Sequence, residues 1–300
     1  MKIKNILICT LAAAMLLAAG CSDEKNSSGN SGAGSNSAGN NDNTGIVSAA
    51  PPELAGFTGN VGEVSPKSGD LIATFEIEGY GTIKAVLFPE AAPLGVENFR
   101  KLADAGFYSG LNLHRVIANF MLQGGSLNGD GTGGDALVED GSFGIEVTQN
   151  ARHFYGALCY ANAQGSNSTQ FYIVNDKTPQ DLDDIDRERY LEIIDEGKGY
   201  IRDSLAAKLD LYADYYRFQT QYYQTTLDWF DGASDEIRAA YLERGGTPFL
   251  DGNYTVFGQV YEGFDVIDAI SAAEVTVNSG GEMSKPVQEI IIKSVTVSEV

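Results

Sequence analysis

The chain has 300 residues and a formal net charge of −21, from 41 acidic and 20 basic residues. This acidity argues against nucleic acid as a partner, because phosphates are bound by basic surfaces. It also argues against a domain that lies flat on anionic lipid, and it favours solubility.

The first 20 residues are typical of a secretory signal. Lys2 and Lys4 precede an apolar run over residues 6–19 that is too short for a confident membrane span. The run ends in LAAGC, which resembles a bacterial lipoprotein processing site with Cys21 as the lipidated residue. An ordinary signal peptide with a chance cysteine is the alternative. We expect a signal peptide at 1–20 and an extracytoplasmic protein anchored to the bacterial cell membrane by lipid, palmitate included, on Cys21.

Residues 22–50 are rich in Ser, Gly and Asn and contain almost no apolar side chains. Such a segment cannot bury enough surface to offset the entropy lost on ordering it. We therefore expect a lipidated, disordered tether over residues 21–67 that holds the folded domain off the membrane. The stretch from Pro51 to Gly69 either extends this tether or forms an irregular lead-in.

Period-two alternation over residues 71–78 and 82–88, on either side of a GYG turn, predicts a hairpin. Between Pro93 and Gly106 apolar residues recur at helical spacing, which predicts a helix. Further strands are expected at 111–117, 119–123, 157–160, 170–174, 254–260 and 288–297, with a second helix near 264–271. Many short strands and two helices are typical of a mainly β fold, here a closed antiparallel barrel.

Residues 178–247 are predicted to be an α-helical insertion, because the segment is too long for an unstructured connection inside a compact domain. Apolar residues recur in it at steps of three, four and seven. This stripe comprises Leu209, Tyr212, Tyr216, Tyr223, Leu227 and Phe230. We expect two or three helices that pack on one another and bury the stripe as their own core. On this view the barrel folds without the insertion.

The cysteines and histidines indicate neither a disulfide nor a metal site. Cys9 is lost with the signal and Cys21 is the lipid site, so Cys159 is the one cysteine left in the mature domain. Cys159 lies in an apolar run, which predicts a buried small hydrophobe. No group of His and Cys has metal-ligand spacing, and we expect no metal and no cofactor.

Arg115 lies in an apolar stretch, LHRVIANFMLQGG, at residues 113–125. Taken alone, it would most often be an edge-strand arginine paired with a carboxylate. Three more motifs follow in order: GTGG at 131–134, YANAQGSNSTQFYI at 160–173 and FLDGNYTVFGQV at 249–260. Together the four resemble the cyclophilin family of peptidyl-prolyl isomerases, over roughly residues 68–177 and 248–300.

The resemblance implies a closed eight-stranded antiparallel barrel capped by two helices, interrupted here by the insertion. It implies that Arg115 is catalytic and donates to the proline nitrogen of a twisted X–Pro bond. The family's substrate-binding positions are matched here by Phe120, Met121, Gln123, Ala161, Asn162, Ala163, Gln170, Tyr172, Phe249, Leu250 and Tyr254. The implied partners are proline-containing unfolded or extended polypeptides, and on a lipid-anchored protein these would be exported proteins.

Tyr172 stands where the family usually has a phenylalanine at the floor of the proline pocket. Its hydroxyl could narrow the pocket or require a partner, so we expect reduced rather than absent activity. The alternative is a peptide-binding chaperone module with little turnover. A structural surface protein would require the four ordered motifs to be accidental. The sequence leaves the oligomeric state open.

Overall fold

The computed structural model describes residues 44–300. The expected signal peptide, the lipid site Cys21 and the first part of the tether lie outside the described residues. Residues 44–67 contain no helix or strand, yet they lie against the folded domain. Val47 exchanges hydrogen bonds with Gln221, and the fully buried Asn60 binds the backbone of Arg152. This differs from the disordered tether expected over these residues and fits the irregular lead-in.

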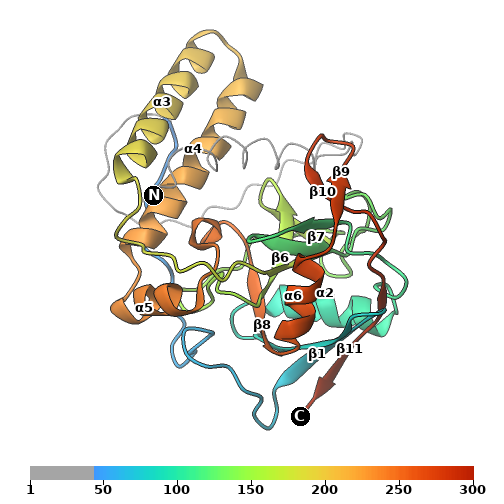
Figure 1. Ribbon diagram of the computed structural model, residues 1–300. Coiled ribbons are helices and arrows are strands. Elements are labelled where there is room, and N and C mark those ends of the chain that lie inside the picture. The colour runs from blue at the N-terminus through green and yellow to red at the C-terminus, as the bar shows by residue number, and fades with distance from the viewer. Residues whose placement is uncertain (1–43) are drawn as a thin grey trace.

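The fold is mainly β, with a nine-stranded antiparallel sheet (Figure 1). Eight strands follow one another across it: β11 (Ile292–Glu299), β1 (Leu71–Ile77), β2 (Gly81–Leu87), β8 (Val256–Glu262), β6 (Ala157–Ala163), β7 (Ser166–Val174), β4 (Met121–Gly124) and β3 (Arg115–Ile117). The ninth, β5 (Phe143–Gly144), pairs with β7. A separate hairpin joins β9 (Val275–Val277) to β10 (Met283–Pro286).

The expected closed barrel is not confirmed, since the sheet is an open half-barrel. Within residues 44–300 no ladder joins β11 to β3; an isolated bridge pairs Asn112 with Ile291 instead. It is flanked by a hydrogen bond of 2.9 Å from the Leu113 amide to the Ile290 carbonyl. The physical reason is length, because β3 has only three residues and the chain before it is mostly turn.

The two expected covering helices are present as α2 (Pro93–Asp104) and α6 (Phe264–Ser271). Proline occupies the first turn of α2, where its missing N–H costs nothing. Phe99 of α2 lies in the core, with its ring centroid 5.1 Å from that of Phe257. Cys159 is a fully buried free cysteine, as predicted.

Three helices occupy the insertion: α3 (Arg187–Ala206), α4 (Asp210–Asp231) and α5 (Asp235–Arg244), followed by the short η1 (Pro248–Leu250). The α3–α4 hairpin projects from the body (Figure 1), and the two helices pack on each other as predicted. No helix between residues 44 and 300 combines the length and apolar character needed to cross a membrane.

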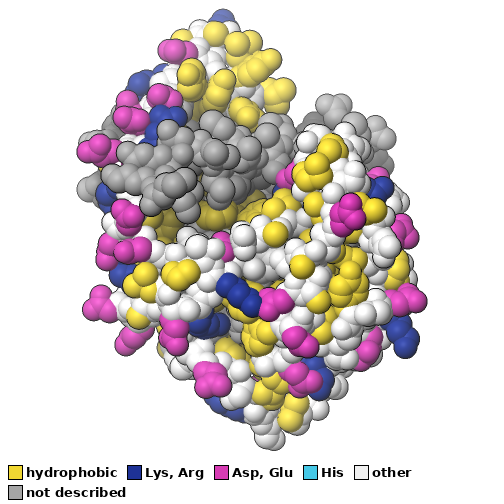
Figure 2. Space-filling view, in the orientation of Figure 1, with side chains coloured by type: hydrophobic (Ala, Val, Ile, Leu, Met, Phe, Trp, Pro, Cys, Tyr) yellow, Lys and Arg dark blue, Asp and Glu magenta, His cyan; other side chains and the backbone are white. Residues whose placement is uncertain are grey.

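The predicted apolar stripe is core only at the base of the insertion. Leu227 and Phe230 are buried, whereas Leu209 and Tyr212 are about half exposed, at 48% and 58%. Hydrophobic side chains gather over the far end of the α3–α4 hairpin in Figure 2. The base packs against the β domain, and the Tyr222 hydroxyl there donates to the carbonyl of Phe249. The expectation that the insertion buries its stripe independently of the barrel is therefore wrong.

Candidate active site

Arg115, Gln123 and Tyr172 form one row across three adjacent strands. Arg115 of β3 is paired with Gln123 of β4, and Gln123 is paired with Tyr172 of β7. Directly opposed residues of antiparallel strands place their side chains on the same face. Arg115 Nη1 donates to Gln123 Oε1 at 3.2 Å, and Gln123 Nε2 donates to Gln170 Oε1 at 3.0 Å. The sheet register therefore orients the guanidinium.

Glu282 is the second partner of Arg115, and the sequence analysis did not identify it. It lies at the end of the turn that joins β9 to β10. Its Oε2 accepts from Nε at 2.7 Å and its Oε1 accepts from Nη2 at 2.8 Å. Burial alone would raise the pKa of Glu282, but the hydrogen bond and charge of Arg115 outweigh it and lower that pKa. The alternative interpretation of Arg115, a pairing with a carboxylate, anticipated such a contact without naming the partner.

An apolar cluster lies beside the guanidinium. Met121, Tyr172 and Leu250 are buried in it, and Phe120 and Phe249 pack against it partly buried. The guanidinium carbon of Arg115 lies 5.7 Å from the ring centroid of Phe120, which stacks on Phe249 with centroids 6.0 Å apart. Ala161 and Tyr254 also contact the cluster. The structure thus brings together every residue expected to line the proline pocket.

The Tyr172 hydroxyl, which could have lacked a partner, is hydrogen-bonded to Nε2 of His153 at 2.9 Å. Nδ1 of the same ring lies 2.8 Å from Oδ1 of Asp251. A hydrogen on Nδ1 satisfies the carboxylate and leaves Nε2 free to accept from Tyr172. Both His153 and Asp251 are buried. The hydroxyl is therefore directed into a buried polar network.

This network extends into the insertion. Oδ2 of Asp251 accepts from Nη1 of Arg152 at 3.0 Å and from the hydroxyl of Tyr241, on α5, at 2.7 Å. Burial alone would raise the pKa of Asp251, but Arg152 and the His153 hydrogen bond lower it. Trp229 of α4 stacks over Arg152, with the guanidinium carbon 4.4 Å from its ring. Two insertion helices thus complete the surroundings of a buried ion pair.

Sequence reasoning missed the buried network, although its carboxylate lies within one of the four motifs. Asp251 is the third residue of FLDGNY. Gly252 follows with φ of +77°, and a Cβ there would lie 2.2 Å from Nε1 of Trp229. Close contact with Trp229 and a positive φ therefore require glycine at position 252, next to the buried Asp251.

Asn162 and Ala163 on β6 and Gln170 on β7 lie on the strands that carry Ala161 and Tyr172 of the cluster. We refer to these three residues, the apolar cluster and Arg115 together as the groove. Asn162 and Gln170 are half-buried and Ala163 is exposed. Asn162 donates from Nδ2 to the carbonyl of Asn253 at 3.0 Å and accepts from the amide of Gly165 at Oδ1. Its side chain therefore holds the β6–β7 turn against the loop after η1.

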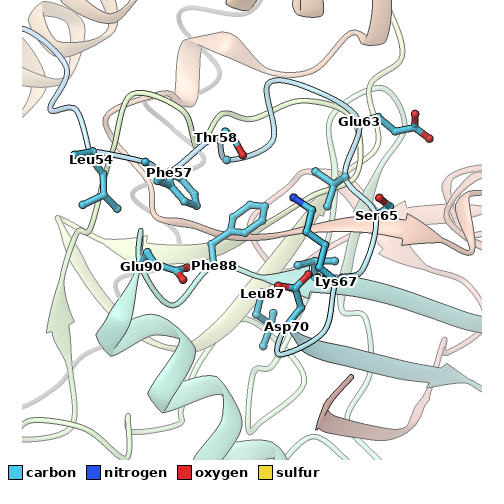
Figure 3. Close-up of a pocket in the computed structure, with 15 residues that line it drawn as sticks. Leu54, Phe57, Thr58, Glu63, Ser65, Lys67, Asp70, Leu87, Phe88 and Glu90 are labelled. Atoms are coloured by element: carbon cyan, nitrogen blue, oxygen red, sulfur yellow. Dashed lines mark hydrogen bonds between the residues drawn. The ribbon is translucent and has the colours of Figure 1, made fainter.

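A cavity of about 350 Å³ lies between residues 54–70 and the end of β2 (Figure 3). Phe57 and Phe88 contact edge to face in it, with centroids 5.5 Å apart. Lys67 and Asp70 lie at its side, where the Lys67 amide donates to the Asp70 carboxylate. None of the expected site residues lines this cavity. The Arg115 groove therefore remains the candidate site.

Comparisons with known proteins bear on the family of the chain. A family model described as "Cyclophilin type peptidyl-prolyl cis-trans isomerase/CLD" matches residues 72–192 and 230–297, leaving most of the α3–α4 hairpin unmatched. A Staphylococcus aureus protein named "Putative peptidyl-prolyl cis-trans isomerase" is 34% identical over 221 residues, covering 73% of this chain and 88% of that protein. A protein of the same name from Staphylococcus haemolyticus is 32% identical over 220 residues, covering 73% and 87%.

Among solved structures, a Cryptosporidium parvum cyclophilin type peptidyl-prolyl cis-trans isomerase aligns with a TM-score of 0.49 and 19% identity. The alignment covers 77% of this chain and 99% of that one.

Proposed function

Because the chain belongs to the cyclophilin-type peptidyl-prolyl cis-trans isomerase family, we propose that Arg115 catalyses isomerisation of X–Pro bonds in exported proteins. The barrier to this rotation is ~18–20 kcal/mol, because resonance gives the peptide bond partial double-bond character. In the twisted state the proline nitrogen becomes pyramidal and regains a lone pair. A cation fixed beside that nitrogen stabilises the twisted state selectively.

One observation carries this proposal: Arg115 is oriented by two partners and still has donors for a substrate. Of its five N–H groups, three are used by Glu282 and Gln123. A fourth, on Nη1, makes only a long contact of 3.9 Å to the sulfur of Met121. The fifth, on Nη2, has no partner within residues 44–300. Arginine suits this role because its fork is rigid and remains charged.

The apolar cluster supplies the other half of the site. Met121, Tyr172 and Leu250 would enclose the proline ring, with Phe120 and Phe249 at the rim. Asn162, together with Ala161, Ala163 and Gln170, would bind the residues before the proline. A protease-coupled assay on an Ala-Pro tetrapeptide tests the proposal, which predicts turnover that depends on Arg115. Absence of turnover would contradict it.

The proposed location is extracytoplasmic, with the mature chain attached to the bacterial membrane through lipid on Cys21. The support is the LAAGC sequence after a short apolar run. Cys21→Ser should release the protein in detergent partitioning. A processed Cys21→Ser protein that stayed with the membrane would contradict this anchor.

A peptide-binding chaperone with little turnover is the second candidate. Two observations favour it: the Glu282 carboxylate offsets the charge of Arg115, and the end of the α3–α4 hairpin exposes Leu211 and Tyr212. Two results together would establish it. The Arg115→Ala protein would suppress aggregation of an unfolded protein as well as the wild type does, and the wild type would show negligible turnover of proline peptides.

A further inference from the structure

A second pocket, of about 180 Å³, lies between the groove and the insertion. Asn162 and Tyr254 line it on the side of the β domain. Phe218, Tyr222 and Thr225 line it on the side of α4. The two walls come from segments far apart in the sequence, and the α4 wall lies within the residues that the family model leaves unmatched. We refer to it as the α4 pocket.

The α4 wall is fixed in place by hydrogen bonds to the loop that carries the groove residues. The hydroxyls of Tyr222 and Thr226 donate to the carbonyl of Phe249 at 3.1 and 3.2 Å. Asn253 Nδ2 in turn donates to Thr226 Oγ1 at 3.0 Å. These contacts bind one helical turn of α4 to η1 and the residues after it. The α4 pocket is therefore a built feature of the groove, with its α4 wall hydrogen-bonded to Phe249, which packs against the apolar cluster.

The lining of the α4 pocket carries no charge. It contains no Asp, Glu, Lys, Arg or His, although the chain has 41 acidic and 20 basic residues. Its amides are already engaged, since Asn162 binds Asn253 and Gln221 exchanges hydrogen bonds with Val47. What remains for a ligand is mainly aromatic and aliphatic surface. The Tyr254 hydroxyl makes no hydrogen bond within residues 44–300 and is a neutral group. A charged side chain would be desolvated there without an opposite charge, which is costly.

The α4 pocket lies close enough to the proline pocket for one extended peptide to reach both. Tyr254 lines the α4 pocket, and its ring centroid is 6.1 Å from that of Tyr172, which the proposed function places at the floor of the proline pocket. An extended chain advances about 3.3–3.6 Å per residue. A side chain within three residues of the proline therefore spans the distance.

We propose that the α4 pocket is a subsite for an apolar or aromatic side chain of the client, within three residues on the N-terminal side of the proline. The inference rests on the proposed function, because it takes Asn162 as a contact for the residues before the proline. The insertion thus adds sequence preference to the isomerase. The subsite selects hydrophobic stretches, which are the segments that unfolded proteins expose.

The test compares kcat/KM over a set of proline tetrapeptides in which Ala, Phe or Glu occupies each of the three positions before the proline. The wild-type protein should prefer Phe over Glu at one position by about ten-fold. Phe218→Ala should reduce that ratio to below about three-fold. Thr225→Lys should reverse it, because a cation in the α4 pocket pairs with Glu. Tyr215 lies one turn from Phe218 on α4 and outside the lining of the pocket. Tyr215→Ala should therefore keep the wild-type ratio of Phe to Glu.

A Phe to Glu ratio that is unchanged in both Phe218→Ala and Thr225→Lys would overturn the subsite while leaving the isomerase intact. Thr225→Lys lengthens a partly exposed side chain of the α4 wall and leaves no cavity, so it keeps the test decisive if Phe218→Ala fails to fold. Lack of turnover by the wild-type protein on every peptide would instead overturn the proposed function, and the subsite with it.

Discussion

Glu282 holds Arg115 by a two-point ion pair, with donor–acceptor distances of 2.7 and 2.8 Å. The carboxylate has two opposed effects on the guanidinium. It fixes the plane of the fork, and it offsets part of the charge that would act on the proline nitrogen. Gln123 also fixes the fork, through Nη1. Orientation is therefore supplied twice, whereas the opposing charge comes from Glu282.

Glu282→Gln should raise kcat/KM at neutral pH by roughly two- to ten-fold. The amide retains a hydrogen-bond acceptor and removes a negative charge, and two unit charges 4 Å apart interact by about 4 kcal/mol at an effective dielectric constant of 20. Only part of this interaction energy affects the lone pair that develops on the proline nitrogen. Glu274→Gln is the matched control, because Glu274 is an exposed acid that precedes the same hairpin. A comparable fall in kcat/KM would show that orientation by the carboxylate outweighs its charge.

The effect of Glu282→Gln should disappear in acid. The pKa of Glu282 is lowered in the folded protein, so its ion pair contributes stability above the unfolded pKa of ~4.3 and loses it as pH falls through the folded value. The ratio of variant to wild-type kcat/KM should approach one only as pH falls through the folded pKa of Glu282, which lies below the unfolded value of ~4.3. Exchange NMR on a proline peptide gives this ratio without a coupling protease. A ratio that stays constant through this range would contradict the charge argument.

Tyr172→Phe should destabilise the protein by about 1–3 kcal/mol, because it leaves the buried Nε2 of His153 without its partner. Turnover of short peptides should be retained, since the hydroxyl is directed at His153. Urea unfolding and kcat/KM measure the two effects separately. Tyr200→Phe on α3 is the control, because the Tyr200 ring is half exposed and lies outside the buried network. Loss of turnover without loss of stability would give the Tyr172 hydroxyl a direct role in the site.

Deleting residues 178–246 and joining Lys177 to Thr247 should prevent the domain from folding. The ends are adjacent, since a Cβ on Gly245 would lie 2.5 Å from the carbonyl carbon of Lys177. The cause is instead the loss of Tyr241 and Trp229, which removes one hydrogen-bond donor to Asp251 and the ring that covers Arg152. Circular dichroism and thermal unfolding of the deletion protein are the measurement. A cooperative unfolding transition near the wild-type temperature would contradict this prediction.

A milder variant tests the same contact. Tyr241→Phe removes one donor to Asp251 and should lower the free energy of unfolding by about 1–3 kcal/mol. Tyr200→Phe on α3, where the ring is half exposed, should have little effect. Equal unfolding free energies for the two variants would show that α5 does not stabilise the buried pair.

Eight strands and the two covering helices could be predicted because each depends on local sequence, whereas β5, β9 and β10 were not predicted. The alternation at 71–78, for example, predicts β1 within one residue. The residues around Arg115 were implied by the family resemblance. The partners of Arg115 and Asp251 depend on contacts between distant segments. Glu282 is 167 residues from Arg115, and Arg152 is 99 residues from Asp251. No spacing rule relates such positions, so the network that joins the insertion to the pocket could not be inferred.

The prediction of a closed barrel was not confirmed, for a related reason. Family resemblance implied a complete ladder, but the ladder depends on how many backbone pairs β3 can make. The turns before Arg115 leave three residues for that strand. The prediction that the outer part of the apolar stripe is buried was wrong because α3 covers only one side of α4, which leaves Tyr212 exposed.

The most direct test of the account is kcat/KM of Arg115→Ala, measured in the wild-type and the Glu282→Gln backgrounds. The second background avoids leaving the Glu282 carboxylate without its partner. We expect a fall of roughly 10²–10³ in both, by analogy with the loss of one oxyanion donor, with the circular dichroism spectrum unchanged. Arg115→Lys should also be poor, since a point charge on a flexible stem does not reproduce the fork. Retention of more than about half of the rate by Arg115→Ala in either background would contradict the catalytic role of Arg115.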